Sequence, residues 1–233
     1  MTRAAKKPRS GRAAEERVFN AVLDAILDHR LAPGTRLGER ELSELLGASR
    51  GAVRAALARL GHSLLVELRP NRGAVIANPT AAERRDLFEA RRVIESALVQ
   101  QLARGLGATQ LAELRAFVAE EQKAYDRGDR KTGQRLSIRF HKVLSELAGN
   151  AELDRFLEHL IRRTPLLTLA RNGGGLAYCG VAEHRELVEA LARRDPALAA
   201  KRMGAHLTSL ENQLLAESEP RAAGLSAALG EPA

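Results

Sequence analysis

Three histidines carry the first chemical signal in this sequence, because each recurs at helical spacing with apolar residues: His141, His184 and His206. Side chains on such a stripe face the interior of a helical bundle. A single histidine of this kind is more often a hydrogen-bonded core residue than a metal ligand, but three on separate helices can converge on one divalent ion. The pattern leaves both alternatives open, a metal site and a set of hydrogen-bonded core residues.

A second signal is a pair of arginines four residues apart. Arg50 and Arg54 share one face of a predicted helix over residues 50–60, and Ser49 before them has the chemistry of an N-cap. Guanidinium groups in this position suit guanine O6 and N7 or phosphate oxygens. Arg40, at the start of the preceding helix, suits contacts to the DNA backbone. The alternative for each arginine is a solvated surface residue.

The elements around these arginines indicate a winged helix-turn-helix domain. The sequence predicts three helices and then two short strands, over residues 14–29, 39–46, 50–60, 65–68 and 74–77. In this fold the second helix of the motif lies in the major groove of DNA. The turn between the strands carries Asn71, Arg72 and Gly73, and a basic tip with glycine can approach a narrow minor groove closely.

The remaining sequence shows only helical periodicity. Six helices are predicted, over residues 81–104, 109–127, 130–148, 151–171, 180–193 and 196–216. We therefore expect a mainly α protein with an N-terminal winged helix-turn-helix, a small β-hairpin wing and a C-terminal antiparallel α-helical bundle. The expected domains are a flexible basic arm at 1–12, the DNA-binding domain at 13–78, an effector-binding domain at 79–216 and a flexible tail at 217–233.

Composition favours a polyanionic partner and excludes several classes of protein. Of the net charge of +8, residues 1–78 hold a balance of +6, with 14 Lys and Arg against 8 Asp and Glu. Aromatic residues make up only 3% of the chain, which favours packed helices over a β-sandwich. The single cysteine, Cys179, excludes an intramolecular disulfide and a Cys-cluster metal site. No apolar run approaches the length of a membrane span and no secretory signal is recognisable, so we expect a cytoplasmic protein.

The N-terminal sequence resembles the DNA-binding domain of the GntR superfamily of bacterial transcription regulators. The run LAPGTRLGERELSELLGASRGAVRAALARL, continuing to RPNRGAVIA, carries the resemblance over about residues 15–79. The resemblance implies that the DNA contacts are made by Arg40, Arg50, Arg54 and the wing residues Asn71, Arg72 and Gly73.

Two positions in this domain depart from the family pattern. Gly38 stands where the family has a serine before the second helix, which makes a weaker cap. Leu64 stands where the family has a glycine before the first wing strand. Because leucine adopts a positive φ only at a cost, we expect the turn at residues 62–64 to have a different shape.

The C-terminal sequence is similar to the all-helical FCD domain, the ligand-binding domain of the FadR-like branch of the same superfamily. The matching segments are EARRVIE at 89–95, RFH at 139–141, AGN at 148–150, EH at 183–184 and MGAHL at 203–207. The resemblance implies a divalent metal, zinc or nickel, held by His141, His184 and His206. It also implies a small-molecule effector, often a carboxylate, that completes the metal's coordination.

Two more residues follow from this resemblance. Ser137 stands at the fourth ligand position, four residues before His141, where the family has Asp or Asn. Loss of that carboxylate weakens the metal site. Arg91 matches a family arginine at the cavity and is expected to face an anionic group of the effector. The alternative for Arg91 is a surface ion pair with Glu95, four residues further along the helix.

Two classes of function remain to be weighed. The first is a homodimeric regulator, not an enzyme, that binds double-stranded operator DNA through two half-sites and responds to an anionic effector. The second is a metal-dependent hydrolase, in which the three histidines hold zinc beside an activated water. The sequence identifies no Asp or Glu as its general base, and the hydrolase leaves the DNA-binding module unexplained. A TetR-type regulator also joins a helix-turn-helix to a helical domain, but the β-wing argues against it. We therefore predict the GntR-type regulator.

Overall fold

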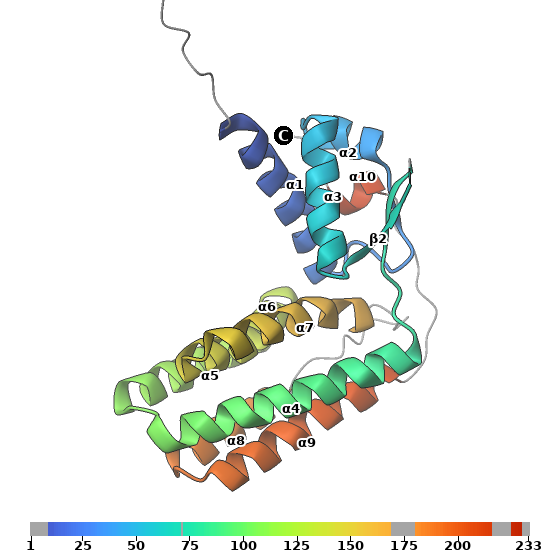
Figure 1. Ribbon diagram of the computed structural model, residues 1–233. Helices are drawn as coiled ribbons and strands as arrows, with labels where there is room; N and C mark the ends of the chain where they lie inside the picture. The colour runs from blue at the N-terminus through green and yellow to red at the C-terminus, as the bar shows by residue number, and fades with distance from the viewer. Residues whose placement is uncertain (1–8, 71, 169–179, 216–224, 230–233) are drawn as a thin grey trace, which may run out of the picture. The chain divides into compact units, whose positions relative to one another are not determined.

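The computed structural model describes residues 9–70, 72–168, 180–215 and 225–229. The chain divides into two compact units, one of residues 1–78 with 220–233 and one of residues 79–219 (Figure 1). The first unit contains three helices, a small sheet and a short C-terminal helix, and the second is helical throughout its described part. The predicted fold class is therefore confirmed.

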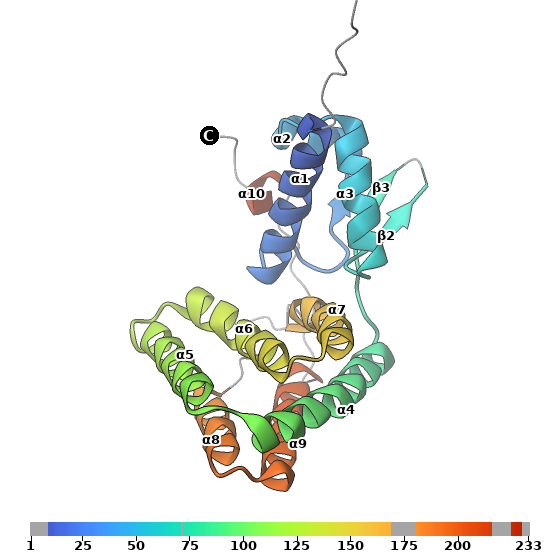
Figure 2. The same cartoon turned by 60° about the vertical axis from the view of Figure 1, so that its left-hand side comes forward.

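Three helices make up most of the first unit: α1 (Arg9–Leu27), α2 (Glu39–Leu45) and α3 (Arg50–His62). Helix α1 packs along α3 (Figure 2). The fully buried residues of the two helices include Val18, Val22, Ile26, Val53, Leu57 and Leu60. Residues 9–12 belong to α1, so the prediction that they are part of a flexible arm is wrong. A helix that is already nucleated by a packed core extends at little cost.

A small antiparallel sheet lies beside these helices. Its strands are β1 (Arg36–Leu37), β2 (Val66–Arg69) and β3 (Gly73–Ile76), in the order β1-β3-β2. The hairpin of β2 and β3 was expected, but β1 was not, because two residues are too few to show a strand periodicity. Strand β1 pairs through Arg36 with Val75 and through Leu37 with Ala74.

The C-terminal helix α10 (Leu225–Leu229) belongs to the first unit, although it follows the helical unit in sequence. It packs against α1 with Leu225 and Ala228 buried. The guanidinium of Arg30 donates a hydrogen bond to the carbonyl of Ala228, which satisfies one of the carbonyls that a helix end leaves open. The prediction of a flexible tail over 217–233 does not account for this helix. Two buried apolar side chains and one hydrogen bond hold it in place.

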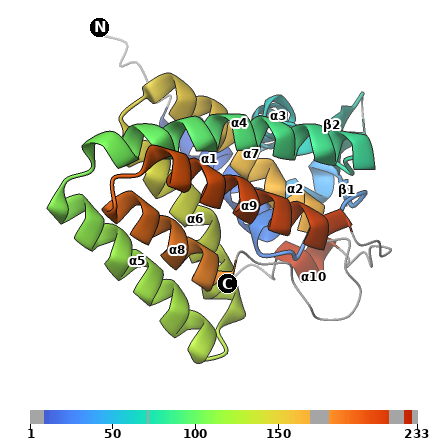
Figure 3. The ribbon, with the colours of Figure 1, turned by 90° about the horizontal axis from the view of Figure 1, so that it is seen from below.

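The described part of the second unit forms six helices: α4 (Ala81–Gly105), α5 (Ala108–Asp126), α6 (Arg130–Ala148), α7 (Ala151–Thr168), α8 (Val181–Ala192) and α9 (Pro196–Leu215). A capping box opens α4, where Thr80 and Glu83 each accept a hydrogen bond from the other's backbone. Helices α4 and α9 run side by side, and α8 lies next to α9 (Figure 3). None of the described helices is long and apolar enough to cross a membrane.

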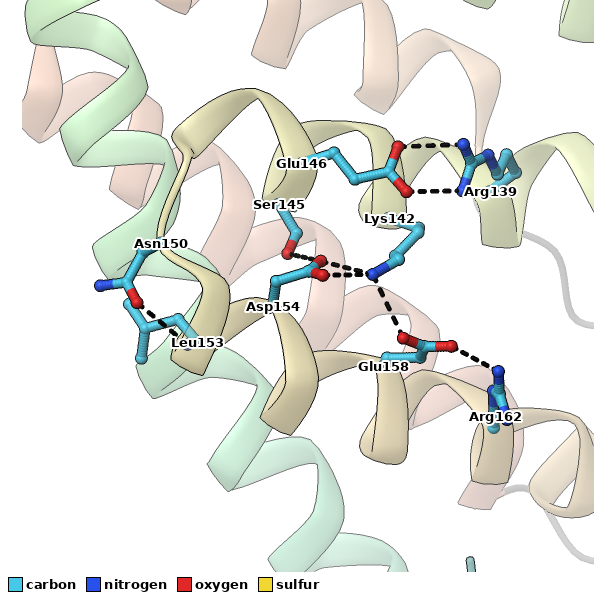
Figure 4. A network of polar contacts seen from close by, with 9 residues as sticks. All are labelled: Arg139, Lys142, Ser145, Glu146, Asn150, Leu153, Asp154, Glu158 and Arg162. Carbon is cyan, nitrogen blue, oxygen red and sulfur yellow. Dashed lines mark hydrogen bonds and ion pairs between the residues drawn. The ribbon is translucent and has the colours of Figure 1, made fainter.

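A polar network ties α6 to α7 on one side of this unit (Figure 4). The Lys142 ammonium lies 2.5 Å from both carboxylate oxygens of Asp154 and 3.3 Å from Glu158. Ser145 donates to Asp154 over 2.5 Å. Asn150 accepts a hydrogen bond from the Leu153 amide, in the first turn of α7, over 3.1 Å, and so caps that helix. The network fixes the two helices against each other and involves none of the three histidines.

The turn after α3 contradicts the expectation drawn from Leu64. Leu64 has a φ of 55°, so it adopts the left-handed conformation that the family's glycine would adopt. The amide of Leu64 donates to the Gly61 carbonyl over 2.9 Å and the amide of Leu65 to the Leu60 carbonyl over 3.0 Å. These bonds form a Schellman motif, and the burial of Leu60 and Leu65 supplies its apolar contact. The motif is strong enough to impose the strain on a leucine.

Replacing Leu64 by glycine is therefore expected to stabilise the protein. The left-handed conformation costs a residue with a Cβ about 1–2 kcal/mol, while glycine loses about 0.5–1 kcal/mol of extra backbone entropy. Half of the Leu64 surface is exposed, so the lost side chain takes little packing with it. We expect a net gain of up to about 1 kcal/mol in the free energy of unfolding, measured by urea denaturation. Leu64→Ala, which keeps the Cβ, is the control, and an equal gain in Leu64→Ala would refute the strain.

Candidate DNA interface and candidate metal centre

The N-terminus of α3 presents the predicted DNA-reading residues to solvent. Ser49 caps the helix by accepting a hydrogen bond from the Ala52 amide over 3.3 Å. Arg50 is exposed, and two thirds of the Arg54 side chain is exposed. The Arg54 Nε lies 2.6 Å from Glu39 of α2. This ion pair holds Arg54, a candidate for base recognition, against α2 and leaves most of its side chain exposed to solvent.

Arg40 lies on the exposed face of α2. Its Nε is 3.0 Å from Glu44, one turn further along the same helix, and 78% of its side chain is exposed. An exposed pair of this kind contributes little to stability, so Arg40 can exchange Glu44 for a phosphate at small cost. The position suits the predicted contact to the DNA backbone.

The sheet adds two arginines that the sequence did not single out. Val75 of β3 pairs with Arg36 on one side and Glu67 on the other, so these three side chains share one face of the sheet. Arg69 lies two residues beyond Glu67 and therefore on the same face. The opposite face carries buried Leu37 and Ala74, which point to the core. Arg36 and Arg69 are thus on the solvent face of the wing.

A groove of about 730 Å³ lies along this solvent face and is lined by Gly34, Arg36, Arg69, Arg72, Ala74 and Val75. Arg72 is exposed near the tip of the hairpin, and Asn71 falls outside the described residues. Gly73 is buried, and a Cβ at this position would lie 2.1 Å from the Leu37 carbonyl oxygen. Glycine is therefore needed at this position for packing, apart from any contact with DNA, because a side chain here would collide with β1.

The second unit brings the three histidines together in its interior. His141 comes from α6, His184 from α8 and His206 from α9, and each is at most 2% exposed. One ring nitrogen from each lies within 4.8 Å of the others, and Nε2 of His206 is 3.3 Å from Nε2 of His141. The Phe140 ring stacks on His184 with centroids 4.1 Å apart, so one side of the cluster is apolar. The prediction that these histidines face the bundle interior is confirmed.

Each of these histidines contacts a glutamate through Nδ1, which the sequence did not predict. The distances are 2.5 Å from His141 to Glu95, 2.8 Å from His184 to Glu121 and 2.7 Å from His206 to Glu183. Glu95 and Glu121 are almost completely buried. One signal was present in the sequence: Glu121 continues the apolar stripe of Leu114 and Val118 at helical spacing.

Arg91 forms the ion pair with Glu95 that the alternative predicted, but this pair is buried and does not lie on the surface. Its Nε lies 2.7 Å from Glu95, and its Nη1 donates to the Thr164 hydroxyl over 3.2 Å. Burial alone would raise the pKa of the Glu95 carboxyl, but Arg91 and His141 beside it hold that pKa at about 2. Glu95 is therefore a carboxylate, held between one arginine and one histidine.

Ser137 lies one turn before His141 on the same buried face of α6. It is 2% exposed, and among the described residues its hydroxyl has no hydrogen-bond partner. A buried hydroxyl without a partner is costly, which suggests that a bound group completes the site. Together with three imidazoles, the donor set fits a borderline ion such as zinc or nickel better than magnesium or calcium, which prefer oxygen ligands.

Both units match known families. Residues 14–76 match the family described as bacterial regulatory proteins, gntR family, and residues 86–209 match the FCD domain. The HTH-type transcriptional regulator Mce2R of Mycobacterium tuberculosis is 30% identical over 237 residues, which cover 91% of this chain and 95% of that protein. The uncharacterized HTH-type transcriptional regulator YdhC of Bacillus subtilis is 26% identical over 81% of this chain and 85% of its own length.

Solved structures agree with these sequence matches. The crystal structure of a putative transcriptional regulator GntR from Rhodococcus sp. RHA1 superposes with a TM-score of 0.74 at 27% identity, covering 87% of this chain and 98% of that one. The E. coli McbR/YncC structure, at 22% identity and a TM-score of 0.75, covers 86% of this chain and 96% of its own, and shows the shared fold. This chain therefore belongs to the GntR family of bacterial transcriptional regulators, with an FCD domain as its second unit.

Proposed function

We propose that this regulator binds operator DNA as a homodimer and changes that binding when an anionic small molecule enters its helical unit. The observation that carries the proposal is the pairing, in one chain, of exposed arginines at the N-terminus of α3 with three buried histidines that converge in a bundle. The first arrangement suits DNA and the second suits a metal with an effector. Because its partner is chromosomal DNA, the protein would act in the cytoplasm.

In the proposed DNA interface, some residues recognise the base sequence and others position the protein on the DNA backbone. Arg50 and Arg54 reach base edges in the major groove from α3, and Ser49 and Arg40 contact phosphates. Arg72 approaches the minor groove from the wing, and its neighbours in sequence, Asn71 and Gly73, stay proposed contacts. A single module of this size makes few contacts, so specific affinity requires two copies on two half-sites.

Arg50→Ala and Arg54→Ala should each weaken specific DNA binding by about 1–3 kcal/mol, because each loses a bidentate contact to a base. Fluorescence anisotropy with a natural operator measures the loss. Arg155→Ala is the matched control, since two thirds of the Arg155 side chain on α7 is exposed, as for Arg54. Its affinity should remain at the wild-type value. A marked drop of melting temperature in Arg54→Ala would show that Arg54 is structural.

The solvent face of the wing should add sequence-independent contacts. Arg36→Ala is expected to reduce the slope of log affinity against log salt by about 1, without changing the preferred sequence, because it removes one phosphate contact. For a dimer that neutralises about 6–10 phosphates, affinity should fall about 10³–10⁵-fold between 50 and 200 mM salt. An unchanged slope in Arg36→Ala would remove Arg36 from the interface. Operator binding that is flat over this salt range would contradict the electrostatic account.

The proposed effector site is built around the three histidines. His141, His184 and His206 would hold zinc or nickel, and an anionic effector would complete the coordination in the absence of the family's Asp at position 137. Ser137 could give the effector a hydrogen bond. Arg91 stays a proposed effector contact, although Glu95 and Thr164 already engage its Nε and Nη1. The hydrolase alternative finds no support among the relatives, which are named as regulators.

Removing a histidine should remove the metal. Wild-type protein dialysed against zinc is expected to retain one ion per chain and to melt at a higher temperature, because an ion that binds only the folded state stabilises it. His141→Ala and His206→Ala should retain none, as measured by elemental analysis. His62→Ala, which changes a histidine at the end of α3 in the DNA-binding unit, is the control and should retain the ion. If wild-type protein holds no zinc or nickel and neither ion raises its melting temperature, the metal proposal fails.

A further inference from the structure

The glutamates beside the histidines offer an inference that rests on the proposed metal site and goes beyond it. All three Nδ1 atoms contact a carboxylate, and each carboxylate comes from a helix other than that of its histidine. Glu95 lies on α4, Glu121 on α5 and Glu183 on α8. The contacts therefore join five helices of the bundle around one point.

Each of these contacts has the same chemical consequence. A carboxylate can only accept a hydrogen bond, so the Nδ1 of its histidine must carry the proton. The lone pair of the neutral imidazole then lies on Nε2, and for His141 and His206 the two Nε2 atoms face each other at 3.3 Å. The carboxylates thus select the tautomer that a metal needs and fix the plane of each ring.

The charges of the cluster also favour a dication. Two of the three glutamates, Glu95 and Glu121, are at most 1% exposed, and the guanidinium of Arg91 lies 2.7 Å from Glu95. A buried charge without a counterion is unfavourable. A divalent ion held by the three histidines would lie close to these acidic side chains, which favour a cation over an anion at this point.

We propose that Glu95, Glu121 and Glu183 form an outer shell that orients His141, His184 and His206 for one divalent cation. The glutamates are positioning residues, since they act through the histidines. Arg91 belongs to the same arrangement, because its Nε and the Glu95 carboxylate are 2.7 Å apart in a pair that is 2% exposed.

Glutamine variants test this shell. Glu95→Gln and Glu121→Gln keep the size of the side chain but remove its charge, and an amide group can present an N–H donor that favours the wrong tautomer. Zinc affinity measured by calorimetry should fall about 10–100-fold in each variant. With cobalt(II) as a second probe, the visible absorption of the bound ion should shift, because the basicity and orientation of its ligands change.

The network of Figure 4 supplies the matched control. Asp154→Asn removes a carboxylate from a polar cluster in the same unit that touches no histidine of the site. It should lower the melting temperature and leave both the zinc affinity and the cobalt spectrum unchanged. If Glu95→Gln or Glu121→Gln fails to fold because its side chain is buried, Glu183→Gln provides a third test. The Glu183 side chain is about one third exposed, so its variant should fold and still lose zinc affinity.

The outcomes separate the shell from the metal site itself. If the glutamine variants bind zinc as tightly as wild type while His141→Ala loses it, the metal site stands and the shell is refuted. If Asp154→Asn loses affinity to the same degree, the effect is general destabilisation and the shell is again refuted. If wild-type protein binds neither zinc nor cobalt, the metal part of the proposed function fails together with the shell.

Discussion

Burial of three imidazoles in an otherwise apolar bundle is the constraint on which the helical unit depends. A buried ring nitrogen needs a partner, and the bundle meets this need on one side of each ring with a glutamate. Two of those glutamates, Glu95 and Glu121, are themselves buried. Glu95 is paired with Arg91, and in our account a cation completes the cluster. The polar cluster thus determines which helices must meet, and the surrounding leucines of α4, α5, α8 and α9 close the core around it.

The DNA-binding unit differs from the helical unit in where its charged side chains lie. Its described core is mainly aliphatic, and its arginines lie at least partly exposed in their ion pairs. Ion pairs such as Arg54 with Glu39 orient side chains without burying them, so they can be exchanged for DNA at small cost. The strained Leu64 and the tightly packed Gly73 show that the wing is held in one shape by backbone bonds and close contact. A rigid wing and an exposed helix end are what a DNA reader needs.

Much of this could be predicted from sequence, because long helices show a period of 3.6 residues. That period identified the inward face of His141, His184 and His206 and the bounds of α6 without error. The two-residue strand β1, the short helix α10 and the φ of Leu64 could not be found in this way, since each depends on contacts between distant parts of the chain. Glu95 was visible only as a helix neighbour of Arg91, and its contact with His141 spans 46 positions.

The central claim is that the three Nε2 atoms form one metal site. It is tested most directly by anomalous diffraction at the zinc absorption edge, on crystals of the full-length protein grown with zinc. We predict a single strong peak per chain, about 2.0–2.1 Å from Nε2 of His141, His184 and His206, with each Nδ1 still bound to its glutamate. A peak on Nδ1, or zinc bound only at other residues while the three rings remain as they are here, would contradict the account.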